Sequence, residues 1–118
     1  CVVGDVSGIT ALMIAAQEGH ERVVELLLQR GADAILQDSN GGTALMLAAG
    51  NGRERVVELL LQRGAEIDLQ NSEGATALML AAIEGHDRVV ELLLQRGAEI
   101  DLQNSYGYTA LMTAARYG

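Results

Sequence analysis

The sequence predicts an all-α repeat solenoid, a stack of copied helical units, and three observations support this prediction. The residues Thr-Ala-Leu-Met recur every 33 positions without a gap, at Thr10–Met13, Thr43–Met46, Thr76–Met79 and Thr109–Met112. A fixed period of this size indicates one supersecondary unit that is repeated along the chain. Apolar residues make up 49% of the chain and aromatic residues only 3%, which suits thin layers of packed helices. Proline is absent, so the 14 glycines supply the breaks between elements.

The first element of each unit is a short helix, taken here from the copy that spans Gly41–Glu73. Thr43 is a natural N-cap, because its hydroxyl can accept a hydrogen bond from an early backbone N–H. Residues 44–49 then form a helix with small, apolar faces. Gly52 can adopt a positive φ and end the helix.

The second element is a helix over Arg55–Gln62, opened by Arg53 and Glu54. Its apolar arc is interrupted only by Glu58, so neighbouring repeats must cover it on more than one side. Arg63 complements the helix dipole at the C-terminus, and the following glycine ends the helix.

The third element is a finger that leads to the next repeat. Ile67–Gln70 alternates apolar and polar residues, which predicts an extended segment with one covered face. Asn71–Gly74 has the composition of a turn. A helix of two turns is marginal alone, so we expect the stability to come from the stack.

These motifs resemble the ankyrin repeat family. Gly-x-Thr-x-Leu-x-x-Ala-Ala opens each unit, and Val-Val-Glu-Leu-Leu-Leu-Gln-Arg-Gly-Ala-Asp/Glu closes each complete one. The resemblance implies a helix-turn-helix with a β-hairpin-like finger in each unit, and a single domain over residues 1–118. It divides the chain into three full units and a half unit, at about 8–40, 41–73, 74–106 and 107–118.

The chain departs from the family's Thr-Pro-Leu-His, which here is Thr-Ala-Leu-Met in all four copies. Losing proline removes a pre-set φ at the first helical position. Methionine replaces a polar group that in the family ties adjacent turns together, and offers adaptable apolar packing instead. We therefore expect the fingers to depend more on packing. The family also implies that His20 and His86 order the junction between the two helices.

Comparison of the copies locates the candidate binding surface. Residues 41–73 and 74–106 agree at 27 of 33 positions. The variable columns lie on either side of the shared glycine before each first helix, and late in that helix. In ankyrin repeats, finger tips and the exposed side of the first helix form a concave surface that grips protein partners. The candidate partner-binding residues are Asn40, Gly42, Gly50, Asn51, Glu73, Ala75, Ile83, Glu84, Tyr106, Tyr108 and Tyr117.

Drift at exposed positions is the alternative explanation for this variation. The columns that contain Glu58 and Gln62 are also expected to be exposed, yet they do not vary. This contrast favours a diversified binding surface. The near-identity of the copies also leaves open an engineered repeat scaffold.

All three tyrosines lie in the last unit, at Tyr106, Tyr108 and Tyr117. Tyrosine is enriched at binding hot spots because it offers a large, rigid contact area with one polar end. We therefore predict that this end of the concave surface carries the most binding energy. The alternative is that Tyr117 covers the exposed end of the stack.

The composition argues against several classes of partner. The net charge of −8 disfavours nucleic acid, which calls for a basic patch. It mildly favours a basic protein surface, although the same charge also keeps an array soluble. The sequence contains no long apolar span, so we expect no membrane insertion. The single Cys1 cannot form an internal disulfide and fits a reducing compartment, for which we expect the cytoplasm.

The residues do not support a catalytic, cofactor or metal site. His20 and His86 occupy the same column two repeats apart, and helices packed about 8–10 Å apart would keep them from converging. Asp38-Ser39-Asn40-Gly41 resembles the start of a calcium loop, but the later carboxylate and the glycine of such a loop do not fit. We therefore expect no enzyme activity and no cofactor.

The last unit contains a first helix and no second helix before Gly118. A fragment of a longer array, a trimmed chain and end-to-end stacking of chains each explain this ending, and we expect a monomer. The leading functional hypothesis is a non-catalytic module that binds a protein partner. The competing hypothesis is a structural spacer within a longer array, or a designed scaffold without a natural partner.

Overall fold

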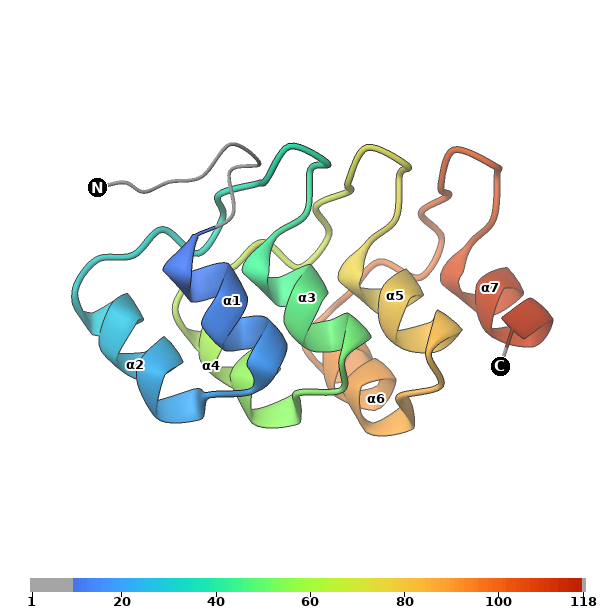
Figure 1. Ribbon diagram of the computed structural model, residues 1–118. Helices are drawn as coiled ribbons and strands as arrows, with labels where there is room; N and C mark the ends of the chain where they lie inside the picture. The colour runs from blue at the N-terminus through green and yellow to red at the C-terminus, as the bar shows by residue number, and fades with distance from the viewer. Residues whose placement is uncertain (1–9, 118) are drawn as a thin grey trace.

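The computed structural model describes residues 10–117, apart from the side chains of residues 114, 116 and 117. This part of the chain contains seven helices and no strand, which confirms the predicted all-α repeat solenoid. The helices come in pairs, and each pair is followed by a loop (Figure 1). Their bounds are α1 Ala11–Glu18, α2 Glu21–Gln29, α3 Ala44–Gly50, α4 Glu54–Gln62, α5 Ala77–Ile83, α6 Asp87–Gln95 and α7 Ala110–Tyr117.

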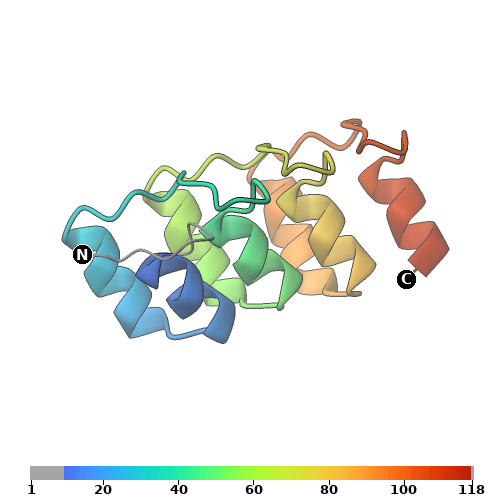
Figure 2. The ribbon, with the colours of Figure 1, turned by 45° about the horizontal axis from the view of Figure 1, so that its top comes forward.

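The helices form two layers. The first helices α1, α3, α5 and α7 pack side by side in one row, and the second helices α2, α4 and α6 form a row behind them (Figure 1). Each first helix also packs against the second helix of its own repeat. The loops project beyond the helices along one edge of the stack, as a second view shows (Figure 2).

Threonine caps begin the first helices, as the sequence predicts. The Oγ1 atoms of Thr10, Thr43, Thr76 and Thr109 accept hydrogen bonds from the backbone N–H three residues later, at 3.1, 3.2, 3.3 and 3.3 Å. Gly52 follows the end of α3 with a φ of 73°, a conformation that glycine adopts without strain. The short helices are therefore bounded by local sequence at both ends.

The core runs continuously through the stack between the two layers. Met13, Met46 and Met79 are buried in it, so in three of the four copies the residue in the family's histidine position packs as an apolar side chain, whereas Met112 is 51% exposed. Val56, Val57 and Leu60 of α4 are fully buried. Helix α4 packs against α3 of its own repeat and against α2 and α6 of the two neighbouring repeats, so it is covered on more than one side, as predicted.

The finger differs from the predicted extended segment. Ile67 and Asp68 form a turn, and the residues that follow are irregular rather than strand. The alternation has another cause: Ile67 and Leu69 pack against the core, while Asp68 Oδ1 accepts a hydrogen bond from the N–H of Glu99 in the next repeat (2.8 Å). The alternation of apolar and polar residues therefore reflects alternating partners, the core for Ile67 and Leu69 and the next repeat for Asp68, without a β-ladder.

Candidate functional site

The loop tips are closed by one side-chain oxygen in each repeat. Asn71 Oδ1 accepts hydrogen bonds from the N–H groups of Glu73 and Ala75, both at 2.9 Å. Asp38 and Asn104 make the same pair of bonds in their own repeats. Local side-chain acceptors of this kind fix a turn. Each tip consequently holds its central residue in a defined position.

Adjacent tips are joined to one another through the backbone. The N–H of Ser72 donates to the carbonyl of Asn40 (2.9 Å), and the N–H of Ser105 donates to the carbonyl of Glu73 (2.8 Å). Gly41 permits this approach, because a Cβ atom there would lie only 2.9 Å from the backbone nitrogen of Ser72. These contacts align Asn40, Glu73 and Tyr106 along the stack, and we call these three residues the tip row.

The tip row is well exposed and ends on a tyrosine. Asn40 and Glu73 are exposed, and Tyr106 is 74% exposed. Tyr108, two residues further along, is half-buried and makes contacts of its own. Of the two described tyrosine side chains, only that of Tyr106 is thus largely available to a partner. The side chain of Tyr117, also a candidate, lies outside the described residues.

One candidate residue offers almost no surface. Ala75 is only 7% exposed, so its methyl group cannot make a substantial contact with a partner. The reason is its place in the loop: it follows Gly74 inside the closed tip and immediately precedes the buried cap Thr76. Gly42, the matching residue one repeat earlier, is half-buried. Direct contact between Ala75 and a partner therefore does not explain why Gly42 and Ala75 differ.

The other variable residues lie where the first helices end, and we call Gly50, Asn51, Ile83 and Glu84 the helix-end row. Asn51 and Glu84 are exposed, whereas Gly50 and Ile83 are half-buried. The side-chain amide of Asn51 donates to the carbonyl of Leu47 (2.8 Å). The same carbonyl also accepts from the backbone N–H of Asn51 (3.2 Å), so Asn51 makes two hydrogen bonds to the end of α3.

The helix-end row is also tied to the next repeat. His86 Nε2 lies 3.1 Å from the carbonyl oxygen of Gly50, which accepts the hydrogen bond and so requires the proton on Nε2. Arg53 occupies the same column and donates from Nε to the carbonyl of Gln17 (3.1 Å). His86 does lie at the junction between α5 and α6, as expected, but its side-chain bond reaches the preceding repeat rather than the junction itself.

The structure aligns each row but keeps the two rows apart. A first helix of seven residues, such as α3, places its two ends about 10 Å from each other. Leu47 and Leu80 lie on the intervening helices and are half-buried. We did not select these leucines from the sequence, because their apolar character fits a core position. The equivalent residues of the first and last repeats are Ile14 and Thr113. This variation between repeats could have marked the position as part of the surface.

Two carboxylates near the tips, those of Asp38 and Asp68, are already engaged. The Asp38 carboxylate accepts from two backbone N–H groups in its tip, and that of Asp68 accepts from the next repeat. Across the described part of the chain, no three His, Cys, Asp or Glu side chains come together in a way that could hold a metal ion. Among the helices described, none has the length and apolar character needed to cross a membrane. Cys1 lies outside the described residues.

Comparison with known proteins agrees with this architecture. The family model described as "Ankyrin repeats (3 copies)" matches residues 2–71 and 63–118, which together cover nearly the whole chain. No curated protein matches the chain.

Proposed function

The chain belongs to the ankyrin repeat family, and from this premise we propose that it binds a protein partner through its tip row and helix-end row. Ankyrin repeats are generally protein–protein interaction modules, and the family is generally non-enzymatic. We also propose that the chain acts as one domain, because its core is continuous from α1 to α7.

The observation that carries this proposal is where the copies differ. Two repeats, residues 41–73 and 74–106, agree at 27 of 33 positions. Four of the six differences fall at the tip and at the ends of the first helices: Glu73/Tyr106, Gly42/Ala75, Gly50/Ile83 and Asn51/Glu84. The other two, Arg53/His86 and Glu54/Asp87, lie where the second helix begins. The constant columns include the threonine caps and the buried methionines. Exposure alone does not explain the variation, because Gln29, Gln62 and Gln95 on the second helices are exposed and identical.

The proposed contact set follows from exposure. Ala75 is omitted because it is buried, and Tyr117 is retained from the sequence. The set is Asn40, Gly42, Gly50, Asn51, Glu73, Ile83, Glu84, Tyr106, Tyr108 and Tyr117.

We propose that the partner presents a basic surface to these rows. Glu73 and Glu84 are exposed within the rows, and the whole chain carries a net charge of −8. Exposed ion pairs contribute little affinity each, so the acidic field would act mainly by steering a basic partner and raising its association rate. The association rate should then fall as the salt concentration rises.

Affinity capture from a cell extract tests the proposal when the chain is compared with two variants. The row variant carries Asn40→Ala, Glu73→Ser, Ile83→Ala, Glu84→Ser and Tyr106→Ser. The control variant carries Gln29→Ser, Gln62→Ser and Gln95→Ser, at positions that are exposed and lie on the second helices.

We expect the control variant to recover the same proteins as the chain, and the row variant to lose them. In a direct affinity measurement, a purified partner should then bind the chain and the control variant equally and the row variant more weakly. Equal recovery by the chain and the row variant would remove the proposed surface. Recovery of no protein by any of the three would favour the structural role instead.

A further inference from the structure

The open face of the first helices is entirely apolar in the two middle repeats. Every residue of α3 is buried except Leu47 and Gly50. Every residue of α5 is buried except Leu80 and Ile83. Because residues three apart lie on the same face of a helix, each helix leaves one narrow face open. We call these four residues the first-helix strip.

The strip is continuous from one repeat to the next. A Cβ atom on Gly50 would lie 3.7 Å from the Cβ atom of Leu80, so the two faces adjoin. Helix α3 packs between α1 and α5, and α5 packs between α3 and α7. The strip is therefore open although a neighbouring repeat lies on each side, which makes its exposure a property of the repeat itself.

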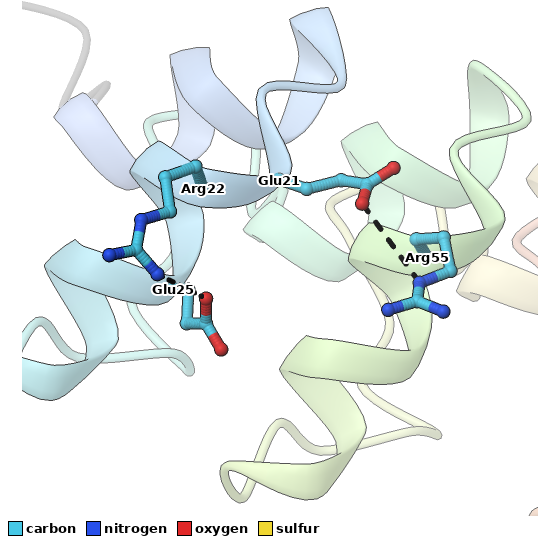
Figure 3. A network of polar contacts seen from close by, with 4 residues as sticks. All are labelled: Glu21, Arg22, Glu25 and Arg55. Carbon is cyan, nitrogen blue, oxygen red and sulfur yellow. Dashed lines mark hydrogen bonds and ion pairs between the residues drawn. The ribbon is translucent and has the colours of Figure 1, made fainter.

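The second helices present a different kind of surface. On α2, Arg22 Nη1 lies 3.3 Å from Glu25 Oε1. Between α2 and α4, Glu21 Oε1 lies 3.9 Å from Arg55 Nε, as Figure 3 shows. Charged side chains thus face solvent there and pair with one another, whereas neither α3 nor α5 contains a polar side chain. An open helix face without polar groups is typical of a surface that another molecule covers.

The residues at the two ends of each first helix match in type. The tip residue precedes the helix, and the outer residue of the helix-end row follows at a constant spacing. The pairs are Asn40 with Asn51 at α3, Glu73 with Glu84 at α5, and Tyr106 with Tyr117 at α7. The corresponding residues at α1, Ser7 and Glu18, differ, and Ser7 lies outside the described residues. One segment that lies between the rows and contacts both would explain why the rows change together.

The space between the rows fits an α-helix. The two rows are about 10 Å apart, and an α-helix with its side chains is about 10–12 Å wide. A helix laid along the stack would contact the strip with one face and one row with each flank. The side chains of an extended segment point to two opposite sides only, so such a segment would not reach the strip and both rows at once.

The spacing of the repeats agrees with the spacing of a helix. First helices pack about 8–10 Å apart, and seven residues of an α-helix rise about 10.5 Å. A helix along the stack would therefore place one heptad on each repeat, with an apolar residue against Leu47 and another against Leu80. Glu73 and Glu84 would face its two flanks at α5. At α3, the exposed Arg53 close to the helix-end row disfavours a basic flank.

We propose that the partner segment between the two rows is a basic amphipathic α-helix, an inference that rests on the function proposed above. The helix lies along the stack, with apolar residues at heptad spacing on the first-helix strip. Basic residues on both flanks face Glu73 and Glu84. Leu47 and Leu80 join the contact set as the residues that receive its apolar side.

The test uses the whole chain and a fluorescein-labelled designed peptide, acetylated and amidated to remove terminal charges. A peptide of about 18 residues is about 27 Å long as a helix, enough to cover three first helices. It carries leucine at the a and d positions, arginine on both sides of this stripe in its central heptad, and alanine and glutamine elsewhere. We expect a saturable rise in anisotropy with a dissociation constant on the order of 10⁻⁴ M, which weakens as the salt concentration rises.

Two leucine variants of the chain locate the apolar contact. Leu47→Gln and Leu80→Gln should each weaken peptide binding at least about fivefold, because they place an amide against the apolar side of the helix. Leu59→Gln is the matched control, since Leu59 is also half-buried beside the core but lies on α4. It should leave the peptide affinity unchanged. Circular dichroism and urea unfolding check that the three variants fold to the same extent.

Gly50→Ile tests the strip in the opposite direction. The variant gives α3 the sequence of α5. The backbone accommodates it, because Gly50 does not have a positive φ and its nearest contact at the Cβ position is an ordinary 3.7 Å. The added apolar surface should raise the peptide affinity about threefold. A loss of folding does not produce such a gain, so this variant decides even if the leucine variants are unstable.

Charge variants locate the two flanks. The double variant Glu73→Gln, Glu84→Gln should weaken binding about fivefold, as expected for two exposed ion pairs. The control Glu54→Gln, Glu91→Gln removes two exposed charges from the second helices and should have a smaller effect. The double variant Glu73→Arg, Glu84→Arg should bind a peptide whose arginines are replaced by glutamates.

Three results would overturn the proposal. These are equal binding of a scrambled peptide of the same composition, equal binding of a peptide with a central proline, and unchanged affinity of both leucine variants together with Gly50→Ile. Proline breaks a helix but leaves an extended segment intact, so its equal binding would identify an extended partner segment instead.

Affinity capture separates this inference from the function on which it rests. If the row variant loses its partners while the peptide shows no saturation up to about 1 mM, the binding function stands and the helical partner is rejected. If the row variant recovers the same proteins as the chain, the binding function itself is rejected.

Discussion

Side-chain oxygen atoms fix the backbone at the two places in each repeat where helical hydrogen bonding stops. Thr43 Oγ1 caps α3, and Asn71 Oδ1 closes the loop tip with two bonds. Among the described residues, no buried side-chain nitrogen or oxygen lacks a hydrogen-bond partner. Single polar residues thus determine where each tip residue stands.

Replacing the tip acceptor should loosen the loop. Asn71→Ala leaves the N–H groups of Glu73 and Ala75 without their acceptor, and we expect a loss of about 1 kcal/mol in the free energy of unfolding. Asn71→Asp is the matched control, because Asp38 makes the same two bonds in its own repeat. Urea unfolding measures both variants. An alanine variant as stable as the aspartate variant would show that the tip does not depend on this side chain.

Tyr106 is the residue from which we expect the largest single effect on partner binding. It is the more exposed of the two described tyrosines and stands at the end of the tip row. Tyr106→Ala should weaken binding to a partner identified by capture by more than about 1 kcal/mol, the usual threshold for a hot spot. Tyr106→Phe should keep most of the affinity if the ring supplies the contact. Calorimetry with the purified partner decides, and a loss well below that threshold would contradict the hypothesis.

At the scale of elements, the turn between two helices depends on a close approach from the next repeat. Gly52 has a φ of 73°, and a Cβ atom there would lie 2.8 Å from Nδ1 of His86. Gly85 has the same φ but no atom within 4 Å of its Cβ position. A side chain at Gly85 would therefore meet only the strain of a positive φ. A side chain at Gly52 would meet that strain and also the ring of His86.

These two glycines separate backbone strain from crowding. Gly85→Ala should cost about 1 kcal/mol of stability, because alanine tolerates a positive φ poorly. Gly52→Ala should cost at least about 1 kcal/mol more, because its methyl group must displace the imidazole that bonds to Gly50. Thermal and urea unfolding of both variants give the difference. Equal losses of stability would mean that the His86 ring moves aside without a measurable loss of free energy.

At the scale of the whole molecule, identical helices have different surroundings. Residues 21–29 and 54–62 have the same sequence, yet Val23 is 46% exposed and its counterpart Val56 is fully buried. Val56 is buried in the core and α4 packs against α2, whereas Val23 is exposed on α2. Stability in such a stack is a sum of repeats and of the interfaces between them.

The same substitution should therefore have unequal effects in the two helices. Val56→Ala leaves a cavity between α2 and α4, and we expect it to cost about 2 kcal/mol. Val23→Ala should cost less than about 0.5 kcal/mol, as is usual for a surface change. Both variants alter helix propensity equally, so the difference measured in urea isolates the interface. Similar losses would show that burial by the neighbouring repeat adds no stability.

The sequence predicted the features that depend on neighbours along the chain. The period of 33 residues, the threonine caps and the glycine breaks follow from local patterns. A bond such as that from the Met46 N–H to Thr43 Oγ1 spans three residues, so its geometry is set by the helix itself. The candidate surface was predicted from variation between copies, and its contact with a partner stays a prediction.

The tertiary structure decided whatever depends on the next repeat. The bond between Asp68 and Glu99 and the bond from His86 to Gly50 both arise between units. Gln70 Nε2, for example, donates to the carbonyl of Gln103, 33 residues away (2.9 Å). The pitch of the stack sets such distances, and the pitch results from packing of whole layers. The 33-residue period by itself states that units stack, whereas the stacked structure determines which surfaces remain open.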